Sequence, residues 1–332
     1  MKNDTKHILP YQVRQYTSEY FSEWNAFLSA AKNTTFLFHR DFMEYHEDRF
    51  MDHSLLIFKE NKLMGLLPAN MSEGIVISHQ GLSYGGLVVA KKAKFSEVMN
   101  MFKAVLSFLS SEGLAELHLK TMPKIYCQGP SDEMDYLLFL LQAEQKRVDL
   151  ASTIDLKHPL KIQSNRMEGV KKAKKQGLSI SEGQDFLPFW NEILVPNLKI
   201  QHKVQPVHSL EEIAALASKF PKNIVQFIVY QGDTVVAGAT IFEVEHLAHV
   251  QYISANQEKQ QLGSLDFLFH YLITERYKDK RYFDFGISNE NQGKNLNEGL
   301  LYWKECFGAR SIAQSFYTIQ TKNYKILDSV FI

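Results

Sequence analysis

The sequence of 332 residues has only two cysteines, no formal net charge and no long hydrophobic segment. Cys127 and Cys306 lie far apart and lack the spacing of a zinc site or a redox pair, so we expect two reduced thiols. Basic and acidic residues both number 37, so the surface as a whole cannot serve as a polyanion-binding surface. No stretch of about 18 apolar residues occurs, and residues 1–16 contain no apolar signal-peptide core. We expect a cytoplasmic protein without membrane insertion.

Common catalytic motifs are also missing. The sequence contains no GxxxxGK(S/T) phosphate loop, no GxGxxG fingerprint, no HExxH helix and no GxSxG elbow. These absences exclude the commonest kinase, ATPase, dehydrogenase, metalloprotease and hydrolase classes, and we expect no bound metal. The composition is 45% hydrophobic and 22% charged, which is typical of a globular chain with about two domains.

The two halves of the sequence show the same order of predicted elements. A hairpin of apolar runs contains Gly65 in the first half and Gly238 in the second. Each hairpin is followed by a further extended segment, an apolar helix and a strand that begins near Ala115 or Tyr282. The glycines lie 173 positions apart (238 − 65) and the strands 167 apart (282 − 115). We therefore infer an α/β fold with mixed sheets, built as two tandem units that share an interface: residues 1–155 and 156–332.

The segment that begins at Tyr282 carries the most specific motifs. A strand reads Phe-Asp-Phe-Gly from Phe283, a loop rich in glycine and asparagine follows, and a helix ends in Trp-Lys-Glu-Cys-Phe-Gly-Ala from Trp303. These motifs resemble the FemAB-like branch of the GNAT acyltransferase superfamily. The basic helix at residues 166–177 and the loop at residues 78–86 agree with that resemblance. It implies two tandem GNAT-like domains, with the donor site in the second.

Three residues are candidates for catalysis. The resemblance implies that Lys304 supports the donor phosphate or the negative charge of the transition state, a role suited to a compact ammonium. A solvated lysine on an amphipathic helix is the alternative. Strand alternation places Asp284 on the same face as Gly286, where Asp284 could accept the amine proton or cap a neighbouring turn. Tyr252 is a candidate hydroxyl for the acceptor site or for general acid catalysis, with packing as the alternative.

The resemblance also implies where the donor binds. In the superfamily, two neighbouring parallel strands splay, and a pyrophosphate rests on the free N–H groups of the next helix. This places the donor, acetyl-CoA or another acyl-CoA, at residues 252–264. The residues expected to contact it are Ser254, Gln260, Gly263 and Ser264. Leu265 stands where the superfamily signature has a small residue, which restricts the approach of phosphates. Branch members that take an aminoacyl-tRNA donor lack the signature, so this donor is the alternative.

The acceptor is expected to be a polar amine, such as an amino sugar, a nucleotide-linked precursor or a peptide. A loop with three glycines lets the backbone approach a ligand closely, although these glycines could simply form turns. The residues expected to contact the acceptor are His79, Tyr84, Gly85, Gly286, Asn289 and Trp303. The leading hypothesis is an N-acyltransferase. The alternatives are an aminoacyl-tRNA-dependent transferase acting on a cell-wall precursor, and a degenerate binding module without catalysis.

Overall fold

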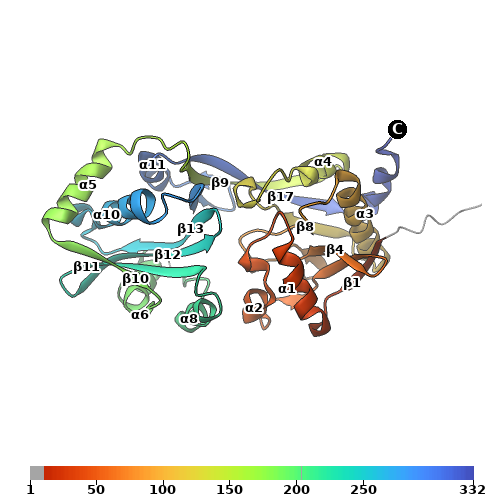
Figure 1. The fold of residues 1–332 in the computed structure, drawn as a ribbon, viewed down its shortest axis with the longest axis horizontal. Helices are drawn as coiled ribbons and strands as arrows, with labels where there is room; N and C mark the ends of the chain where they lie inside the picture. Colours follow the sequence, from red (N-terminus) through yellow and green to blue (C-terminus); the bar gives the residue numbers. More distant parts are fainter. Residues whose placement is uncertain (1–10, 203) are drawn as a thin grey trace, which may run out of the picture. The chain divides into compact units, whose positions relative to one another are not determined.

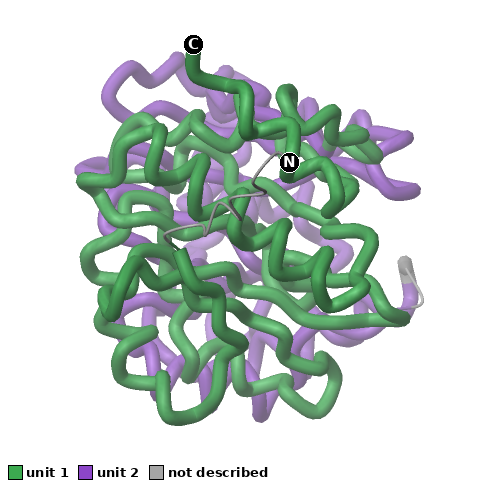
Figure 2. Tube along the Cα trace, turned by 90° about the vertical axis from the view of Figure 1, so that its right-hand side faces the viewer, with its two compact units in different colours: residues 1–148, 314–332 green, residues 149–313 purple. Residues whose placement is uncertain are grey.

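The chain divides into two compact units in the computed structural model, which describes residues 11–202 and 204–332. Unit 1 consists of residues 1–148 and 314–332, and unit 2 of residues 149–313 (Figure 2). Most of the polar amino-terminal segment lies outside the described residues. The sequence places one boundary at residue 155, whereas the structure returns the end of the chain to unit 1. The reason is that Phe316–Gln320 of the last strand pair antiparallel with a strand of unit 1.

Unit 1 contains two groups of paired strands. The first has the order β1, β3, β4 and β7, and the second the order β17, β8, β6, β5 and β2. The strands are β1 (Tyr11–Gln15), β2 (Met51–Asp52), β3 (Leu55–Lys59), β4 (Lys62–Leu67), β5 (Asn70–Ser72), β6 (Ile75–Ile77), β7 (Val88–Val89), β8 (Glu116–Lys120) and β17 (Arg310–Gln320). The helices are α1 (Phe21–Ser29), α2 (Arg40–Met43), α3 (Phe95–Ser111) and α4 (Glu133–Leu140).

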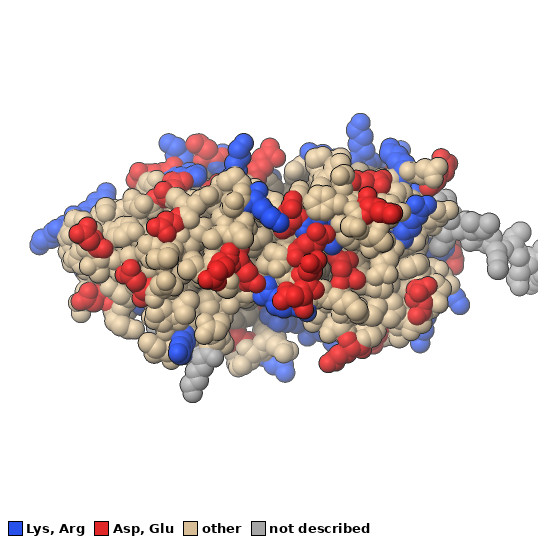
Figure 3. Space-filling model, turned by 90° about the horizontal axis from the view of Figure 1, so that it is seen from below, with Lys and Arg blue, Asp and Glu red and all other residues tan. Residues whose placement is uncertain are grey.

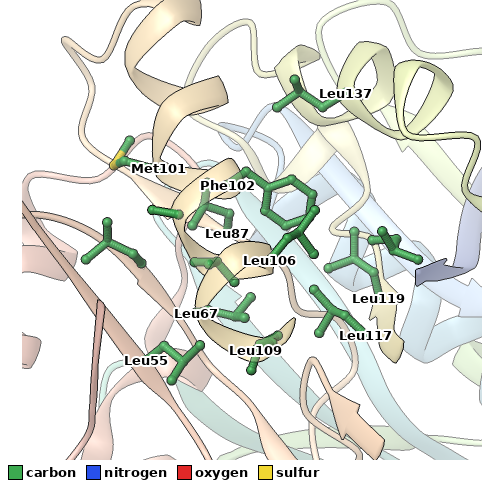
Figure 4. Close-up of a cluster of buried hydrophobic side chains, with 14 of the residues drawn as sticks. Leu55, Leu67, Leu87, Met101, Phe102, Leu106, Leu109, Leu117, Leu119 and Leu137 are labelled. Atoms are coloured by element: carbon green, nitrogen blue, oxygen red, sulfur yellow. The ribbon is translucent and has the colours of Figure 1, made fainter. Parts of the chain in front are cut away.

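The core of unit 1 forms around α3. Its apolar side chains recur at the helical period, as the sequence predicts, and they bury one face against the strands. Figure 4 shows Phe102, Leu106 and Leu109 of α3 among leucines of β3, β4 and β8. The helix stops just before Gly113, whose φ of 77° is a conformation that glycine adopts without strain.

Unit 2 is a sheet with helices on both faces. Its strands have the order β10, β11, β12, β13, β14 and β9. Helices α5, α10 and α11 lie on one face of this sheet, and α6 and α8 lie on the other (Figure 1). The strands are β9 (Glu144–Asp155), β10 (Leu178–Gly183), β11 (Ile224–Gln231), β12 (Thr234–Val244), β13 (Leu247–Ala255) and β14 (Tyr282–Ile287), followed by the small pair β15 (Asn289–Glu290) and β16 (Asn295–Leu296). The helices are α5 (Ser164–Lys175), α6 (Leu187–Phe189), α7 (Val195–Asn197), α8 (Leu210–Lys219), α9 (Lys259–Leu262), α10 (Ser264–Tyr271) and α11 (Glu298–Cys306).

The repeat inferred from the order of elements is present in the pairing of the strands. In unit 1, β5 pairs antiparallel with β6, and β6 pairs parallel with β8. In unit 2, β12 pairs antiparallel with β13, and β13 pairs parallel with β14. Both hairpins also carry a bulge close to the glycine that the sequence comparison used. The bulged residue is Met64, directly before Gly65, in unit 1 and Val236, two residues before Gly238, in unit 2. The expected fold class, two tandem α/β units with mixed sheets, is confirmed.

Several elements were not expected from the sequence. One π-helical turn, Trp190–Leu194, connects α6 to α7, and another, Leu198–His202, follows α7. A run of 3-10 helix, Thr321–Ser329, ends the chain in unit 1. Within the described ranges, no helix combines the length and the apolar character needed to cross a membrane.

Candidate functional site

The parallel strands β13 and β14 separate in the middle of unit 2. Their pairing covers Leu247 with Tyr282, Ala248 with Phe283 and His249 with Asp284. In the described strands it ends there, although β13 continues to Ala255 and β14 to Ile287. We call this place, where His249 and Asp284 form the last pair, the fork. The splayed strands that the resemblance implies are therefore present.

The strand β14 leaves β13 because its backbone changes direction at Gly286. This residue has a φ of 70°, a region that glycine occupies readily and most residues avoid. On its other side, β14 shifts register against β9 between Asp284 and Ile287. A Cβ added at Gly286 would lie 3.2 Å from Cε1 of His249. Glycine at this position thus leaves room for the imidazole beside the fork.

A histidine and an aspartate meet at the fork. Nδ1 of His249 lies 2.9 Å from Oδ2 of Asp284. The other carboxylate oxygen of Asp284 accepts hydrogen bonds from Oγ1 of Thr153 at 2.9 Å and from N of Gly286 at 3.0 Å. A carboxylate accepts hydrogen bonds, so Nδ1 of His249 is the donor in this contact, and Nε2 is the ring nitrogen that does not face the carboxylate. The Asp284 side chain is 3% exposed, whereas that of His249 is 19% exposed.

Lys304 of α11 lies beneath the segment that follows Asp284. Its ammonium donates to O of Gly286 at 2.9 Å, to O of Ile287 at 2.7 Å and to Oγ of Ser288 at 2.9 Å. The residue is 3% exposed, and burial lowers the pKa of its side chain to about 8, an effect that the charge of Asp284 opposes. The three N–H groups of the ammonium are all used in these bonds. Lys304 therefore supports the bent end of β14.

Trp303, the neighbour of Lys304, faces a different environment. Its indole packs against the rings of Phe269, Phe285 and Phe307. Its Nε1 donates to Oδ1 of Asp266 at 3.1 Å, and Arg166 binds the same oxygen at 3.0 Å. Trp303 thus belongs to the packing between α10 and α11.

The turn between α9 and α10 contains the residues expected to bind the cofactor. Gly263 has a φ of 68°, and a Cβ there would lie 2.1 Å from the carbonyl oxygen of Gly169 in α5. Ser264 is fully buried, and its hydroxyl has no hydrogen-bond partner, while Gln260 is exposed. Because α5 fills one side of this turn, a donor phosphate here has to bind on the side away from Gly169.

Two further candidates lie on β13 beyond the fork. Oη of Tyr252 lies 2.7 Å from Nδ1 of His208 and accepts a hydrogen bond from the backbone N–H of His208 at 3.2 Å. Burial raises the pKa of Tyr252 to about 12, so its hydroxyl stays protonated at neutral pH. Oγ of Ser254 accepts a hydrogen bond from Nδ2 of Asn197 at 2.8 Å. Both side chains thereby attach β13 to the segment that precedes α8.

The remaining acceptor candidates of unit 2 lie along the segment after Asp284. Gly286 forms the bend described above. Asn289 accepts a hydrogen bond from the backbone N–H of Leu150 and donates to the carbonyl of Gly293 at 3.2 Å. Asn289 therefore holds the loop that follows β14 against β9.

In unit 1, the place that corresponds to the fork is filled by the loop that follows β6. After β6, the N–H of Ser78 donates to O of His118 at 2.9 Å, and Oγ of Ser78 accepts from N of Lys120 at 2.9 Å. Further along, the N–H of Gly85 donates to O of Lys120 at 2.8 Å. The loop after β6 therefore continues alongside β8, and the strands of unit 1 do not part as β13 and β14 do.

The other loop candidates, His79 and Tyr84, are buried within unit 1. The ring of His79 stacks on that of His46 at 5.2 Å, and burial lowers the pKa of His79 to about 3. Oη of Tyr84 lies 2.9 Å from Oγ1 of Thr35. A Cβ at Gly85 would lie 1.8 Å from O of Ser78, so this glycine permits the close approach of two loop strands. These positions pack the loop of unit 1.

The structure thus brings Asp284, Gly286 and Lys304 together at the fork of unit 2. It adds His249 and Thr153, which sequence reasoning missed. His249 lies 35 positions before Asp284, and only the register of a parallel strand pair relates them. The strand alternation that suggested a functional Asp284 contains no signal for its partner.

Comparison with known proteins supports the fold assignment. No protein-family model matches the sequence, and no curated protein matches it significantly. Solved structures do match. FemX has a TM-score of 0.64 at 9% identity, and the alignment covers 94% of this chain and 98% of FemX. L-PGS from Bacillus licheniformis has a TM-score of 0.60 at 10% identity, covering 94% of both chains. A tandem GNAT protein from the clavulanic acid biosynthesis pathway has a TM-score of 0.51 at 10% identity, covering 94% of this chain and 98% of that protein.

These similarities define the class of fold. Identities near 10% over almost the whole chain show a shared architecture, and the architecture is that of the tandem GNAT-like and FemAB-like acyltransferases. The resemblance that the motifs after Tyr282 indicated is therefore confirmed at the level of the fold. Fold alone does not determine substrate or donor, which depend on the site.

Proposed function

We propose that the chain is an N-acyltransferase whose reaction takes place at the fork of unit 2. His249 is the general base, and Asp284 positions it. The observation that carries this proposal is the 2.9 Å contact between Nδ1 of His249 and Oδ2 of Asp284 at the last pair of β13 and β14. An imidazole held in one tautomer by a buried carboxylate, beside two parting strands, is arranged to accept a proton from a bound nucleophile.

The reaction balances with the groups at the fork. The amine nitrogen of the acceptor attacks the carbonyl carbon of the acyl donor, and its proton moves to Nε2 of His249. The bond from the carbonyl carbon to the leaving sulfur or oxygen then breaks, and the leaving group takes the proton from the imidazolium. We assign stabilisation of the oxyanion to backbone N–H groups of β13 beyond its last pair with β14, since fixed hydrogen-bond donors in a water-poor site stabilise developing negative charge most strongly.

Lys304 has a supporting part in this proposal. Its ammonium already donates to Gly286, Ile287 and Ser288, so we assign it to hold β14 in the bent path that keeps the fork open. The expected direct role of Lys304 toward a donor phosphate would require it to leave these three acceptors. Tyr252 likewise acts through its bond to His208 rather than as the acid.

The donor we propose is an acyl-CoA, with aminoacyl-tRNA as the alternative. Two observations favour the alternative: Leu265 replaces a small residue of the phosphate-binding signature, and α5 fills one side of the turn at Gly263. Against it, the described residues on the face seen in Figure 3 form no continuous basic surface, because acidic and basic side chains are interspersed. The acceptor is a polar amine, and the proposed location is the cytoplasm.

A donor panel tests the proposal. A ligand that binds only the native state raises its stability, so thermal unfolding of the full chain is compared with acetyl-CoA, with aminoacylated tRNA and with the same tRNA uncharged. Stabilisation by acetyl-CoA, followed by release of its thiol when amino sugars or peptides are added, supports the leading proposal. Stabilisation by charged tRNA alone supports the alternative.

His249→Gln provides the control for catalysis. This change removes the base and leaves the strands in place, so the variant should keep the donor-induced stabilisation and lose turnover. His158→Gln alters a histidine of unit 2 whose side chain is 84% exposed, and it should behave as wild type. If no donor stabilises the wild-type chain and no turnover occurs, the degenerate binding module is the better description.

A further inference from the structure

The exposed side of α5 carries a concentration of positive charge. Residues 157–177, which include this helix, contain seven lysine or arginine residues and one acidic residue, Glu168. Four exposed lysines in the second half of α5 form what we call the lysine face: Lys171, Lys172, Lys174 and Lys175. Within the described residues, the ammonium groups of these four lysines have no hydrogen bond and no ion pair.

Two acids near the lysine face leave most of its charge uncompensated. Glu168 lies one helical turn before Lys171 and Lys172 and can offset one positive charge. Asp266 of α10 attracts Lys172, but Arg166 already forms an ion pair with its carboxylate at 3.0 Å. The lysine face therefore keeps an excess of positive charge.

The buried side of α5 determines where these lysines point. Gly169, Val170 and Ala173 are buried, and a Cβ added at Gly169 would lie 2.1 Å from Oδ2 of Asp266. This stripe therefore packs against α10, and the two helices lie on the same face of the sheet (Figure 1). At about 3.6 residues per turn, the four lysines occupy the opposite side of the helix. The lysine face is thus turned away from the body of unit 2.

The four lysines repel one another along the helix. Lys171 lies three residues before Lys174 and four before Lys175, and Lys172 lies three before Lys175, so three like-charge pairs stand on neighbouring turns. Pairs at these spacings destabilise a helix. The negative end of the helix macrodipole attracts lysines of the last turn, but Lys171 lies before that turn. An external array of negative charges would relieve the repulsion along the whole face.

An exposed aromatic ring borders the lysine face. Tyr302 of α11 is 55% exposed, and its Oη lies 3.5 Å from Nδ2 of Asn165 in the first turn of α5. Lys172 follows Asn165 by two helical turns, about 10 Å, on the same side of the helix. Tyrosine has an apolar ring with a polar end, and it favours the headgroup level of a membrane. One side of unit 2 therefore exposes lysines together with a tyrosine.

We propose that the lysine face, with Tyr302 at its border, docks unit 2 on an anionic lipid surface. A field of lipid headgroups requires only positive charge spread over a surface, and each lysine supplies a compact point charge. Base recognition in nucleic acids relies largely on the planar guanidinium, and the arginine of α5, Arg166, is bound to Asp266. Docking of this kind does not rest on the proposed transferase activity and needs no helix that crosses the bilayer.

Co-sedimentation of the full chain with lipid vesicles tests the proposal. Vesicles of phosphatidylcholine with about one-third phosphatidylglycerol should bind the chain at low ionic strength, and vesicles of phosphatidylcholine alone should not. Added salt should weaken this binding, because salt screens exposed charges. Lys171→Gln combined with Lys175→Gln should weaken it about 25-fold, since one lysine near an anionic membrane raises the affinity about fivefold. Tyr302→Ser should weaken it at least about twofold.

Lys91→Gln combined with Lys92→Gln is the matched control. It removes two adjacent exposed lysines of unit 1, changes the net charge equally and should leave the vesicle affinity unchanged. All variants alter exposed side chains and should unfold at the wild-type temperature. The proposal is overturned if the chain binds neither kind of vesicle or both equally, if the two double variants lose equal affinity, or if the α5 variant loses affinity for a short RNA duplex instead. Unchanged binding of Tyr302→Ser overturns the part assigned to Tyr302.

Discussion

Nδ1 of His249 lies 2.9 Å from Oδ2 of Asp284, at the point where β13 and β14 cease to pair. The carboxylate is also held by Thr153 and by the backbone of Gly286, so three donors fix its orientation. In the proposed reaction, a buried acid with this many donors directs the imidazole rather than acting on a substrate itself. The ring nitrogen of His249 that does not face this carboxylate is Nε2.

The first prediction concerns this pair. His249→Gln removes the general base and should reduce kcat by about 10²–10⁴. Asp284→Asn presents an amide that no longer fixes the tautomer, and it should also lower kcat.

Damage to the folded structure would be another explanation for a lower kcat, and it is tested separately. Both variants should retain donor-induced stabilisation within a small margin of wild type, and KM should change less than kcat. Equal rates for His249→Gln and His158→Gln would refute the role assigned to His249.

The second prediction compares two glycines of nearly equal backbone conformation. Gly263 has a φ of 68° and Gly177 a φ of 69°, but a Cβ at Gly263 would lie 2.1 Å from O of Gly169, while one at Gly177 meets nothing within 4 Å. Gly177→Ala should lower the free energy of unfolding by about 1 kcal/mol, the cost of a left-handed conformation. Gly263→Ala should lower it by about 2 kcal/mol more, because α5 and α10 are forced apart.

Urea unfolding of the two variants measures this difference. The difference between the two variants reports the contact between α5 and the turn at Gly263, because the cost of the left-handed backbone conformation is the same in both. Equal losses would show that α5 is able to move away from Gly263 without penalty, and the turn would then be open to a donor phosphate on both sides.

Much of the fold could be predicted from local patterns, and less of the site. The hairpin that contains Gly65 and the helix that starts at Phe95 follow from apolar spacing and turn residues, which act over short distances. The return of the chain end to unit 1 depends on Phe316–Gln320 pairing with β8, a long-range contact without a local signal. The burial of Lys304 could not be predicted from the sequence either. Its three acceptors lie at the bend where β14 ends, and Gly286 is the one residue that indicates this bend in the sequence.

The third prediction uses the buried histidine of unit 1. Burial first, and the charges of His46, Arg40 and Lys120 in addition, lower the pKa of His79 from 6.5 to about 3. The unfolded chain therefore takes up this proton before the folded chain does, so stability falls as the pH drops below 6.5. At pH 5 the loss from this residue should be about 2 kcal/mol.

His79→Asn tests that loss. His79 has a φ of 111°, and asparagine is among the residues that tolerate positive φ. The variant should lose about 2 kcal/mol less than wild type between pH 7 and pH 5, measured by urea unfolding at both values. His158→Asn, at an exposed histidine, serves as control. Parallel losses in wild type and His79→Asn would mean that His79 gains its proton in the folded state.

The last prediction concerns Lys304. Lys304→Met leaves the carbonyls of Gly286 and Ile287 without their donor, so the free energy of unfolding at pH 7 should fall by about 1–3 kcal/mol. Burial lowers the pKa of Lys304 from 10.5 to about 8. Between these values the unfolded chain binds more protons than the folded chain, so the Lys304 contribution to wild-type stability rises with pH, by on the order of 3 kcal/mol at most.

The stability of wild type minus that of Lys304→Met should therefore be constant below pH 8 and increase from pH 8 to 10. Other lysines and tyrosines titrate in both proteins and cancel in the difference. A constant difference across this range would show that the three hydrogen bonds to Gly286, Ile287 and Ser288 keep the ammonium charged, and that the bend of β14 depends on a permanent cation. At pH 7 the kcat of Lys304→Met should also fall, and by more than the loss of folded protein explains, because the path of β14 sets the position of Asp284.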